Sequence, residues 1–269
     1  MKYVIDHDFH IHSRLSSCSN DPEQSTEAIL RYAEETGLKT ICLTDHYWDE
    51  RVPGASPWYA VQNTSHVNEA LPLPKSDKVK FLFGCETEFN RNFTVGVSKE
   101  RFDELDFVII PTTHMHMNEF VIPEDFVDTC ENRAKLWVKR LDTLLSMDLP
   151  FEKIGLAHLT CQLINRKSAE VYLKTLELLP EEELVRLFTK AKNLGCGIEL
   201  NRSDMSFGFG GRDTVLRIYE IAKMCGCKFY LGTDAHHPDA LYGMREVFEP
   251  VIDTLGLTED DKFIPKTTK

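Results

Sequence analysis

The sequence predicts an α/β protein in which parallel strands alternate with helices, as in a barrel or a doubly wound sheet. Seven short runs rich in β-forming residues are separated, for the most part, by amphipathic helical patterns. The 269 residues, 42% of them hydrophobic, can build one sizeable core and match the usual size of a single α/β barrel, about 250 residues. Because no linker and no internal repeat interrupts the pattern, residues 1–269 are interpreted as one domain.

The predicted strands are runs of β-branched and aromatic residues that end in polar or turn-forming residues. They are expected at residues 3–9, 39–44, 79–85, 107–111, 153–157, 196–200 and 228–232. Between them, two long segments rich in Pro or Gly are expected to be loops, at residues 48–78 and 201–212. Loops that follow strands often carry binding residues, so both are candidates for that role.

Four helices are expected at residues 26–36, 124–147, 181–194 and 213–225. The first and third end at Gly37 and Gly195, because glycine readily takes the left-handed conformation that closes a helix. Three glutamates follow Pro180 at the start of the third helix, where carboxylates favour the positive end of the helix dipole. In the second helix, apolar residues recur at helical spacing from Val127 to Leu141.

The charge balance excludes some classes of partner. Lys and Arg together number 31 against 43 Asp and Glu, which gives a formal net charge of −12 at pH 7. So acidic a surface repels a phosphate backbone and argues against nonspecific binding of nucleic acid. A phosphorylated ligand would therefore need local positive charge, from Arg, Lys or bound metal.

The sequence also indicates a compartment. It contains no apolar run of about 18 residues that would predict a membrane span. Its first residues are charged and lack the apolar centre of a signal peptide. The eight cysteines lie mostly in core-like contexts and are expected to be reduced, buried thiols. A cytoplasmic protein without membrane contact is therefore expected.

Most of the histidines fall at the carboxyl ends of predicted strands, together with carboxylates. At the end of the first strand, Asp8, His10 and His12 are expected to share one face, because side chains alternate along a strand. The other polar strand-end residues are Asp45, His46, Glu86, Glu88, His114, His116, His158, Glu199, Asn201, Asp234 and His236. Carboxyl ends of parallel strands converge on one rim, where α/β active sites lie, so these side chains are expected to meet.

No single residue of this set is diagnostic, because a histidine after an apolar strand is more often a hydrogen-bonded core residue. The combination, repeated at nearly every predicted strand end, indicates a clustered metal site. Imidazole and carboxylate ligands with little sulfur suit zinc, iron or manganese. His7, His66 and His237 lie outside the pattern and are interpreted as structural.

Taken in order along the chain, these motifs resemble those of the PHP (polymerase and histidinol phosphatase) superfamily. The motifs are Asp8-x-His10-x-His12-Ser13, Thr44-Asp45-His46, Gly84-x-Glu86, His114, Ala157-His158 and Asp234-Ala235-His236. The resemblance covers essentially the whole chain and implies a distorted (β/α)7 barrel with a metal cluster at the carboxyl rim of the strands. No polymerase follows in this sequence, so the chain resembles the stand-alone phosphatase branch.

The resemblance implies two to three divalent ions, of zinc, iron or manganese. One ion would be held by His10, His12, Glu86 and Asp234. A second would share Glu86 and add His158 and His114, with His116 as the alternative to His114.

A third ion is implied at His46 and His236, with one more ligand from the loop after the first strand. Where histidinol phosphatases of this type have a histidine in that loop, this chain has Cys18. A thiolate is a reasonable ligand for zinc, and Asp21 is the alternative.

The cluster implies a metal-dependent phosphoesterase in which a metal-bridging hydroxide attacks phosphorus without a covalent enzyme intermediate. Asp8 and Asp45 are expected to orient ligating histidines. Asn201 is expected to position a water molecule or the substrate. Arg166 and Arg202 follow strand ends closely enough for a guanidinium group to bind a phosphate.

The leading hypothesis is hydrolysis of a small phosphomonoester, and histidinol phosphate is the most specific candidate the family offers. A small phosphorylated metabolite is therefore the expected partner, and the oligomeric state is left open. One alternative is a phosphodiesterase or exonuclease acting on nucleotides, against which the acidic charge and the lack of a basic stripe both argue. The other alternative is a metal-binding barrel without catalytic activity.

Overall fold

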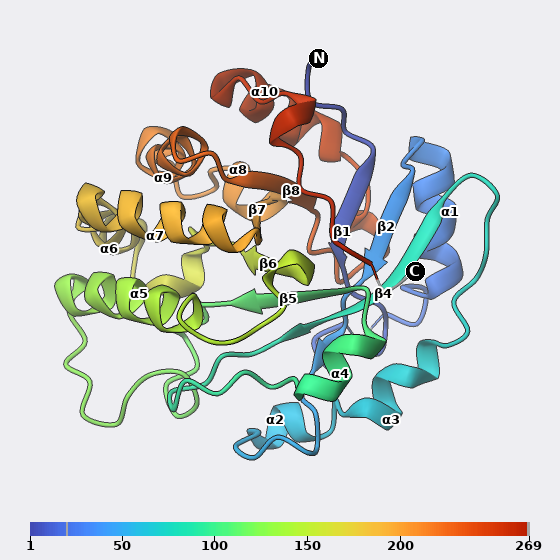
Figure 1. Ribbon diagram of the computed structural model, residues 1–269, viewed down its shortest axis with the longest axis horizontal. Coiled ribbons are helices and arrows are strands. Elements are labelled where there is room, and N and C mark those ends of the chain that lie inside the picture. The colour runs from blue at the N-terminus through green and yellow to red at the C-terminus, as the bar shows by residue number, and fades with distance from the viewer. Residues whose placement is uncertain (20, 268–269) are drawn as a thin grey trace.

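Parallel strands form one sheet that curls into a nearly closed barrel in the computed structural model, which describes residues 1–19 and 21–267 (Figure 1). The strands are β1 (His7–Ile11), β2 (Thr40–Leu43), β3 (His46–Tyr47), β4 (Lys80–Thr87), β5 (Phe107–Pro111), β6 (Ile154–Ala157), β7 (Gly197–Asn201) and β8 (Lys228–Gly232). They pair in the order β1-β2-β4-β5-β6-β7-β8, and the short β3 pairs with the end of β4. The predicted barrel of parallel strands is confirmed.

Main-chain hydrogen bonds close the barrel at the carboxyl end of β1. Ile11 forms an isolated parallel bridge with Ala235, just beyond the end of β8. The Asp234 amide donates to the His10 carbonyl at 2.7 Å, and the His12 amide donates to the Ala235 carbonyl at 3.0 Å. The backbone segments that carry the first and last ligating motifs are thereby fixed side by side.

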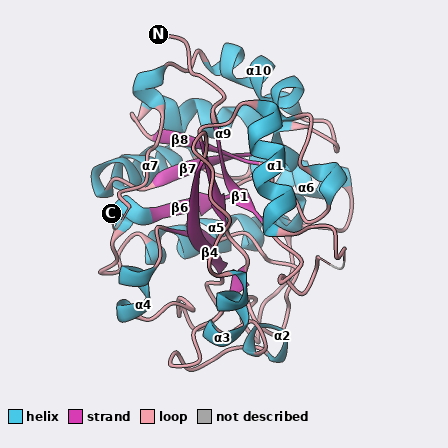
Figure 2. Cartoon of the chain, turned by 90° about the vertical axis from the view of Figure 1, so that its right-hand side faces the viewer, coloured by secondary structure: helices cyan, strands magenta, loops and turns pink. Residues whose placement is uncertain are grey.

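Helices surround the barrel (Figures 1 and 2). The longer ones are α1 (Thr26–Thr36), α5 (Cys130–Leu144), α6 (Ala169–Glu177), α7 (Glu181–Leu194), α9 (Arg212–Met224) and α10 (Met244–Leu255). The shorter ones are α2 (Pro57–Ala60), α3 (Thr64–Val67), α4 (Lys99–Glu104) and α8 (Arg202–Met205). Short 3₁₀ helices occur at Asn68–Ala70, Phe151–Lys153, Gln162–Ile164, Pro238–Ala240 and Glu259–Asp261. Both segments expected to be loops therefore contain short helices.

The helix predicted at residues 124–147 begins later, at Cys130. Thr129 caps its N-terminus, because the threonine side chain accepts a hydrogen bond from the Asn132 amide. Val127, predicted to lie on the apolar stripe, is instead 67% exposed. By contrast, α1 and α7 end as predicted at Gly37 and Gly195, both with positive φ.

The interior of the barrel is filled by a separate apolar cluster of strand residues, which Phe263, from the segment after the last 3₁₀ helix, completes. It includes Phe9, Cys42, Leu82, Phe107, Ile109, Ala157, Tyr230 and Phe263. Glycines on β6 and β7 make room for the largest rings. A Cβ atom on Gly155 would lie 2.4 Å from the Tyr230 hydroxyl and 2.5 Å from the Phe107 ring.

All eight cysteines are free thiols, and most of them are buried, as predicted. Among the described residues, no helix combines the length and apolar character needed to cross a membrane.

Replacing Gly155 by alanine should destabilise the barrel, because neither ring that a Cβ would meet can move without disturbing the interior cluster. We expect Gly155→Ala to lower the free energy of unfolding by about 1–3 kcal/mol. Urea-induced unfolding, followed by circular dichroism, measures the change. Gly208→Ala is the control, since its Cβ would meet nothing closer than 3.6 Å. Equal stability of the two variants would contradict this account of the interior.

Candidate metal centre

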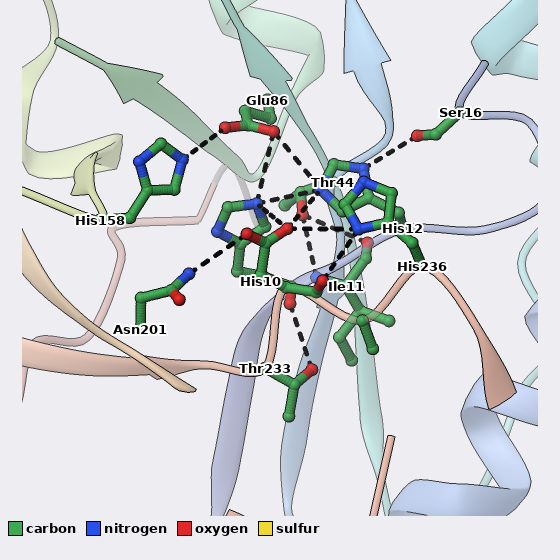
Figure 3. A network of polar contacts seen from close by, with 12 residues as sticks. His10, Ile11, His12, Ser16, Thr44, Glu86, His158, Asn201, Thr233 and His236 are labelled. Carbon is green, nitrogen blue, oxygen red and sulfur yellow. Dashed lines mark hydrogen bonds and ion pairs between the residues drawn. The ribbon is translucent and has the colours of Figure 1, made fainter. Parts of the chain in front are cut away.

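Four ligand-type side chains meet where the barrel closes (Figure 3). The Nε2 atoms of His10, on β1, and His12, directly after it, lie 3.0 Å apart. Glu86, near the end of β4, places its Oε2 atom 3.5 and 3.4 Å from these two nitrogens. Asp234, after β8, places its Oδ1 atom 3.4 and 3.3 Å from the same nitrogens. All four residues are buried or nearly so.

The hydrogen bonds of the Nδ1 atoms of His10 and His12 show whether the two facing Nε2 atoms are able to bind an ion. The His10 Nδ1 atom lies 2.7 Å from a carboxylate oxygen of Glu199, so it carries a proton. The His12 Nδ1 atom lies 2.9 Å from the Ser16 hydroxyl, which donates its own proton to Asp45 and therefore accepts from His12. In neutral rings both Nε2 atoms would then present lone pairs to each other. A cation between them removes that repulsion, so these residues fit a bound metal ion.

A second group joins Glu86 to the ends of β5 and β6. Ligand atoms of Glu86, His114 and His158 all lie within 4.8 Å of one another. The His158 Nε2 atom is 3.1 Å from Glu86 Oε1, and its Nδ1 atom is 3.1 Å from the Thr113 hydroxyl. The His114 Nδ1 atom is bound at 2.7 Å by Glu88, which leaves Nε2 available to an ion.

The third group consists of His12, His46 and His236, again with ligand atoms within 4.8 Å of one another. The rings of His12 and His236 stack with their centroids 3.9 Å apart. The buried His46 Nδ1 atom has no hydrogen-bond partner among the described residues, although it lies 3.1 Å from Glu86 Oε2. An unpaired buried nitrogen in contact with a carboxylate also fits an ion.

The two loop residues considered for the third ion are placed differently. Cys18 lines the cavity above the cluster, but within residues 1–19 and 21–267 its thiol joins none of the three groups. Desolvation and the charges of Glu86 and Asp234 raise the pKa of this thiol to about 12. Asp21 pairs instead with His237 at 2.7 Å.

Electrostatics within the cluster keep its carboxylates charged. Burial opposes the charge of Glu86, but the charge of His10 and the hydrogen bonds from the His10 and His12 rings outweigh burial and hold its pKa well below the ordinary value. Asp234 behaves in the same way, with His10 as the main opposing charge. Burial also holds the pKa of His46 well below its ordinary value, so this imidazole is neutral and able to bind metal.

Backbone strain marks two of these residues. His158 and Asp234 have φ values of 29° and 55°, in the left-handed region that non-glycine residues seldom adopt. Such strain is typical of functional sites, where the surrounding structure enforces it.

Asp8, expected to orient a histidine, occupies a different position. The register of β1 shifts between Asp8 and Ile11, and the Asp8 carboxylate accepts a hydrogen bond from the His10 amide at 3.3 Å. It also accepts hydrogen bonds from the amide and hydroxyl of Thr233 and from the Tyr32 hydroxyl. Asp8 therefore links β1 to the end of β8 and holds the His10 backbone, and a role in orienting a ligating ring stays a prediction.

The other two predicted supporting residues lie within the cluster. Asp45 acts on His12 through Ser16, as described above. Asn201 donates to Asp234 Oδ2 at 3.3 Å (Figure 3), and its side-chain oxygen caps α8 by accepting from the Ser203 amide.

Sequence reasoning missed the roles of two glutamates. Glu199 is fully buried and binds both the His10 ring and the His158 amide, the latter at 2.6 Å. Glu88, expected only as one of the polar residues at the strand ends, is fully buried against His114 and lies 3.5 Å from the buried Arg140. The alternation of side chains along the strand placed Glu199 on the same face as Asn201, as the sequence predicted, but it did not show which groups Glu199 binds.

A cavity of about 690 Å³ opens above the cluster. Its lining includes Glu86, His46, His114, His158, Asp234 and His236. His116 also lines it, with a buried Nδ1 atom that has no hydrogen-bond partner in the described part of the chain. Neither predicted phosphate-binding arginine lines it. Arg166 is exposed, and its charge contributes to lowering the pKa of His116, whereas Arg202 donates to the Ala240 carbonyl.

The chain belongs to the PHP domain family, because the sequence model of that domain matches residues 8–203. This confirms the resemblance seen in the strand-end motifs and defines the chain as a metal-dependent phosphoesterase by class. A search of curated proteins found no match.

Two solved structures share the fold. One is the histidinol phosphate phosphatase of Lactococcus lactis subsp. lactis, complexed with zinc, L-histidinol and phosphate. Its TM-score is 0.57 and its sequence identity to this chain is 16%, and the alignment covers 94% of each chain. The other is a putative histidinol phosphatase of Listeria monocytogenes, at a TM-score of 0.61 and 13% identity, covering 90% of this chain and 99% of that one. Identities this low establish similarity of fold alone.

Glu199→Gln should weaken metal binding, because one amide oxygen cannot accept from both the His10 ring and the His158 amide. We expect affinity for zinc to fall about 10–100-fold, the usual effect of removing a group that orients a metal ligand. Competition against a chromophoric chelator measures it, and Glu220→Gln on the exposed face of α9 is the control. Unchanged affinity in a folded Glu199→Gln protein would refute the role given to Glu199.

Metal binding should release protons at pH 7. Burial alone would lower the pKa of His10, but the charges of Asp234, Glu199 and Glu86 outweigh burial and raise the pKa of His10 well above its ordinary value. The pKa of His12 is also raised. The His10 ring is therefore protonated without metal and must lose a proton to bind an ion. The release should diminish as the pH rises through these raised pKa values. Calorimetric titration with zinc in buffers of different ionisation enthalpy measures the number of protons released. Zero release at pH 7 would contradict the expectation that zinc displaces a proton from these histidines.

Proposed function

We propose that this protein hydrolyses a small phosphomonoester at a centre that holds two to three divalent ions, with histidinol phosphate as the most specific candidate substrate. The observation that carries the proposal is the set of three adjoining groups of ligand atoms at the base of one cavity. The cavity volume of about 690 Å³ lies within the range of small-molecule sites.

The ligand groups assign residues to ions. His10, His12 and Asp234 would hold one ion, and Glu86, His114 and His158 a second. His46 and His236 would hold the third, with His12 as the neighbouring ligand and Cys18 as the alternative. Glu86 is the bridging candidate, since its two oxygens face His10, His12 and His46 on one side and His158 on the other.

When bound, such ions supply a positive site for phosphoryl oxygens and lower the pKa of water toward about 7. The protein's own residues prepare that site. Glu199 and the Asp45–Ser16 pair hold the rings of His10 and His12 with Nε2 directed inward. Asn201 steadies Asp234.

The charge of the cavity supports a metal-dependent reaction. Among the described residues that line it, there is no lysine or arginine to meet a phosphate. Bound ions are then the source of positive charge, and Arg166, near His116, is the first candidate for an additional phosphate contact. The zinc, L-histidinol and phosphate in the Lactococcus lactis structure support histidinol phosphate as the first ester to test.

Purified protein with added manganese or zinc should release phosphate from phosphomonoesters, with histidinol phosphate preferred. His10→Ala should reduce kcat/KM by about a thousandfold, because it removes a ligand of an ion that stabilises charge on phosphorus. Malachite-green detection across a panel of monoesters measures the release.

Strong preference for another monoester would support the proposed phosphomonoesterase activity but contradict histidinol phosphate as the substrate. Absence of release from every monoester, in protein shown by elemental analysis to hold metal, would contradict the proposed function. Activity that survives in His10→Ala protein would contradict the assignment of the first ion.

A further inference from the structure

The first and last strands, β1 and β8, meet where the barrel closes (Figure 1), and they do so without regular strand pairing. In the described part of the chain they share one isolated bridge, from Ile11 to Ala235 beyond the end of β8. The edge of β8 that faces β1 carries the amides of Leu231 and Thr233, because every second residue of a strand directs its amide to the same side. A buried amide without a partner costs free energy, so these two amides need acceptors other than a ladder.

Side chains of β1 supply those acceptors. The Leu231 amide donates to His7 Nε2 at 3.1 Å. The Thr233 amide donates to Asp8 Oδ1 at 3.0 Å, and the Thr233 hydroxyl donates to Asp8 Oδ2 at 2.7 Å. His7 and Asp8 therefore replace the missing ladder, and their contacts with β8 are here called the side-chain seam.

His7 is prepared to accept a hydrogen bond at the side-chain seam. Its Nδ1 atom lies 3.1 Å from Asp6 Oδ1 and carries the proton, which leaves a lone pair on Nε2 for the β8 amide. Burial opposes the charge of Asp6, but hydrogen bonds from His7 and Lys262 outweigh burial and hold the pKa of Asp6 at about 2. Burial lowers the pKa of His7, so the ring is neutral at pH 7. The Tyr3 hydroxyl, 3.4 Å from His7 Nε2, donates to the Phe229 carbonyl of β8 at 2.8 Å.

The side-chain seam fixes the register of β8 against β1. Asp234 directly follows Thr233, so the seam determines where Asp234 meets His10. A slip of one residue would turn the side chains of β8 to the opposite face. Two of the three ligand groups combine residues of both segments, through Asp234 or His236. The second group, which contains His114, includes no residue of either segment.

We infer that His7 is a positioning residue of the metal centre. By accepting the Leu231 amide, it holds β8 in the register that brings Asp234 to the ligands carried by β1. His7 is not among the described residues that line the cavity, so its effect on the centre passes through the backbone of β8. The inference deepens the proposed function and rests on it for a role in hydrolysis, whereas zinc affinity and amide exchange are measured without a substrate.

Two amide substitutions separate the Nε2 atom from the rest of the ring. In His7→Gln the side-chain amide reaches the position of Nε2 and can accept from Leu231, whereas in His7→Asn it is one methylene shorter and cannot. For His7→Asn we expect the zinc affinity of the group that contains Asp234 to fall about tenfold, as when a group that orients a metal ligand is lost. The affinity of the group that contains His114 should stay unchanged, and His7→Gln should preserve both affinities.

Competition against a chromophoric chelator resolves the zinc-binding steps. Asp234→Ala and His114→Ala identify which step belongs to which ligand group, because each removes one ligand.

Amide hydrogen exchange tests the same contact independently of zinc affinity. In zinc-loaded His7→Asn protein, the amides of Leu231 and Asp234 should exchange about tenfold faster than in the unaltered protein, and in His7→Gln they should not. Nuclear magnetic resonance of ¹⁵N-labelled protein measures these rates. Thr175→Val is the control, because it removes a buried hydrogen bond to Asn165 that involves neither β1 nor β8. It should change neither the two exchange rates nor the zinc affinities.

Equal weakening of every zinc-binding step in folded His7→Asn protein would indicate a general loss of stability and overturn the inference, as would unchanged affinity. Failure of His7→Gln to preserve the affinities would also overturn it, since the ring and not the acceptor would then matter. If His7→Asn does not fold, Tyr3→Phe removes only the hydroxyl that binds the Phe229 carbonyl and must weaken the Asp234 group selectively. Uniform or absent weakening in Tyr3→Phe would overturn the inference. Lack of phosphatase activity in the unaltered protein would contradict the proposed function and leave these binding results to decide the role of His7.

Discussion

The close approach of two imidazole nitrogens is the constraint on which the rest of the structure depends. His10 and His12 direct Nε2 atoms at each other across 3.0 Å, with their other nitrogens already committed to Glu199 and Ser16. An arrangement of this kind is unfavourable without positive charge between the rings. The barrel closure, the buried carboxylates and the strained backbone at Asp234 all serve to maintain it.

Most of the fold and the ligand set could be predicted because both follow from local rules. Strands at Phe107–Pro111 and Lys228–Gly232 lie where the β-rich runs predicted them. The convergence of parallel strand ends then places His114 and His158 beside Glu86, and His46 beside His12 and His236, although these residues are far apart in the chain. No knowledge of contacts was needed, since the topology alone brings the carboxyl ends to one rim.

The supporting residues could not be assigned in this way, because their roles depend on distances between strands. Glu199 binds a ring 189 positions away, and nothing near Glu199 in the sequence marks that pairing. Glu88 faces inward to His114 and Arg140 only because α5 covers the end of β5. The hydrogen bonds of Asp8 to Thr233 and Tyr32 could not be predicted either, because an irregularity in β1 interrupts the simple alternation of its side chains.

The closure of the barrel also has a consequence for biosynthesis. The candidate centre combines His10 and His12 with Asp234 and His236, which are translated long after them. A nascent chain that has emerged only as far as β7 carries most of the candidate ligands but neither of the last two. Loading of the complete centre would therefore have to wait for the synthesis of β8 and the segment after it, and a product interrupted before that point would lack a finished site.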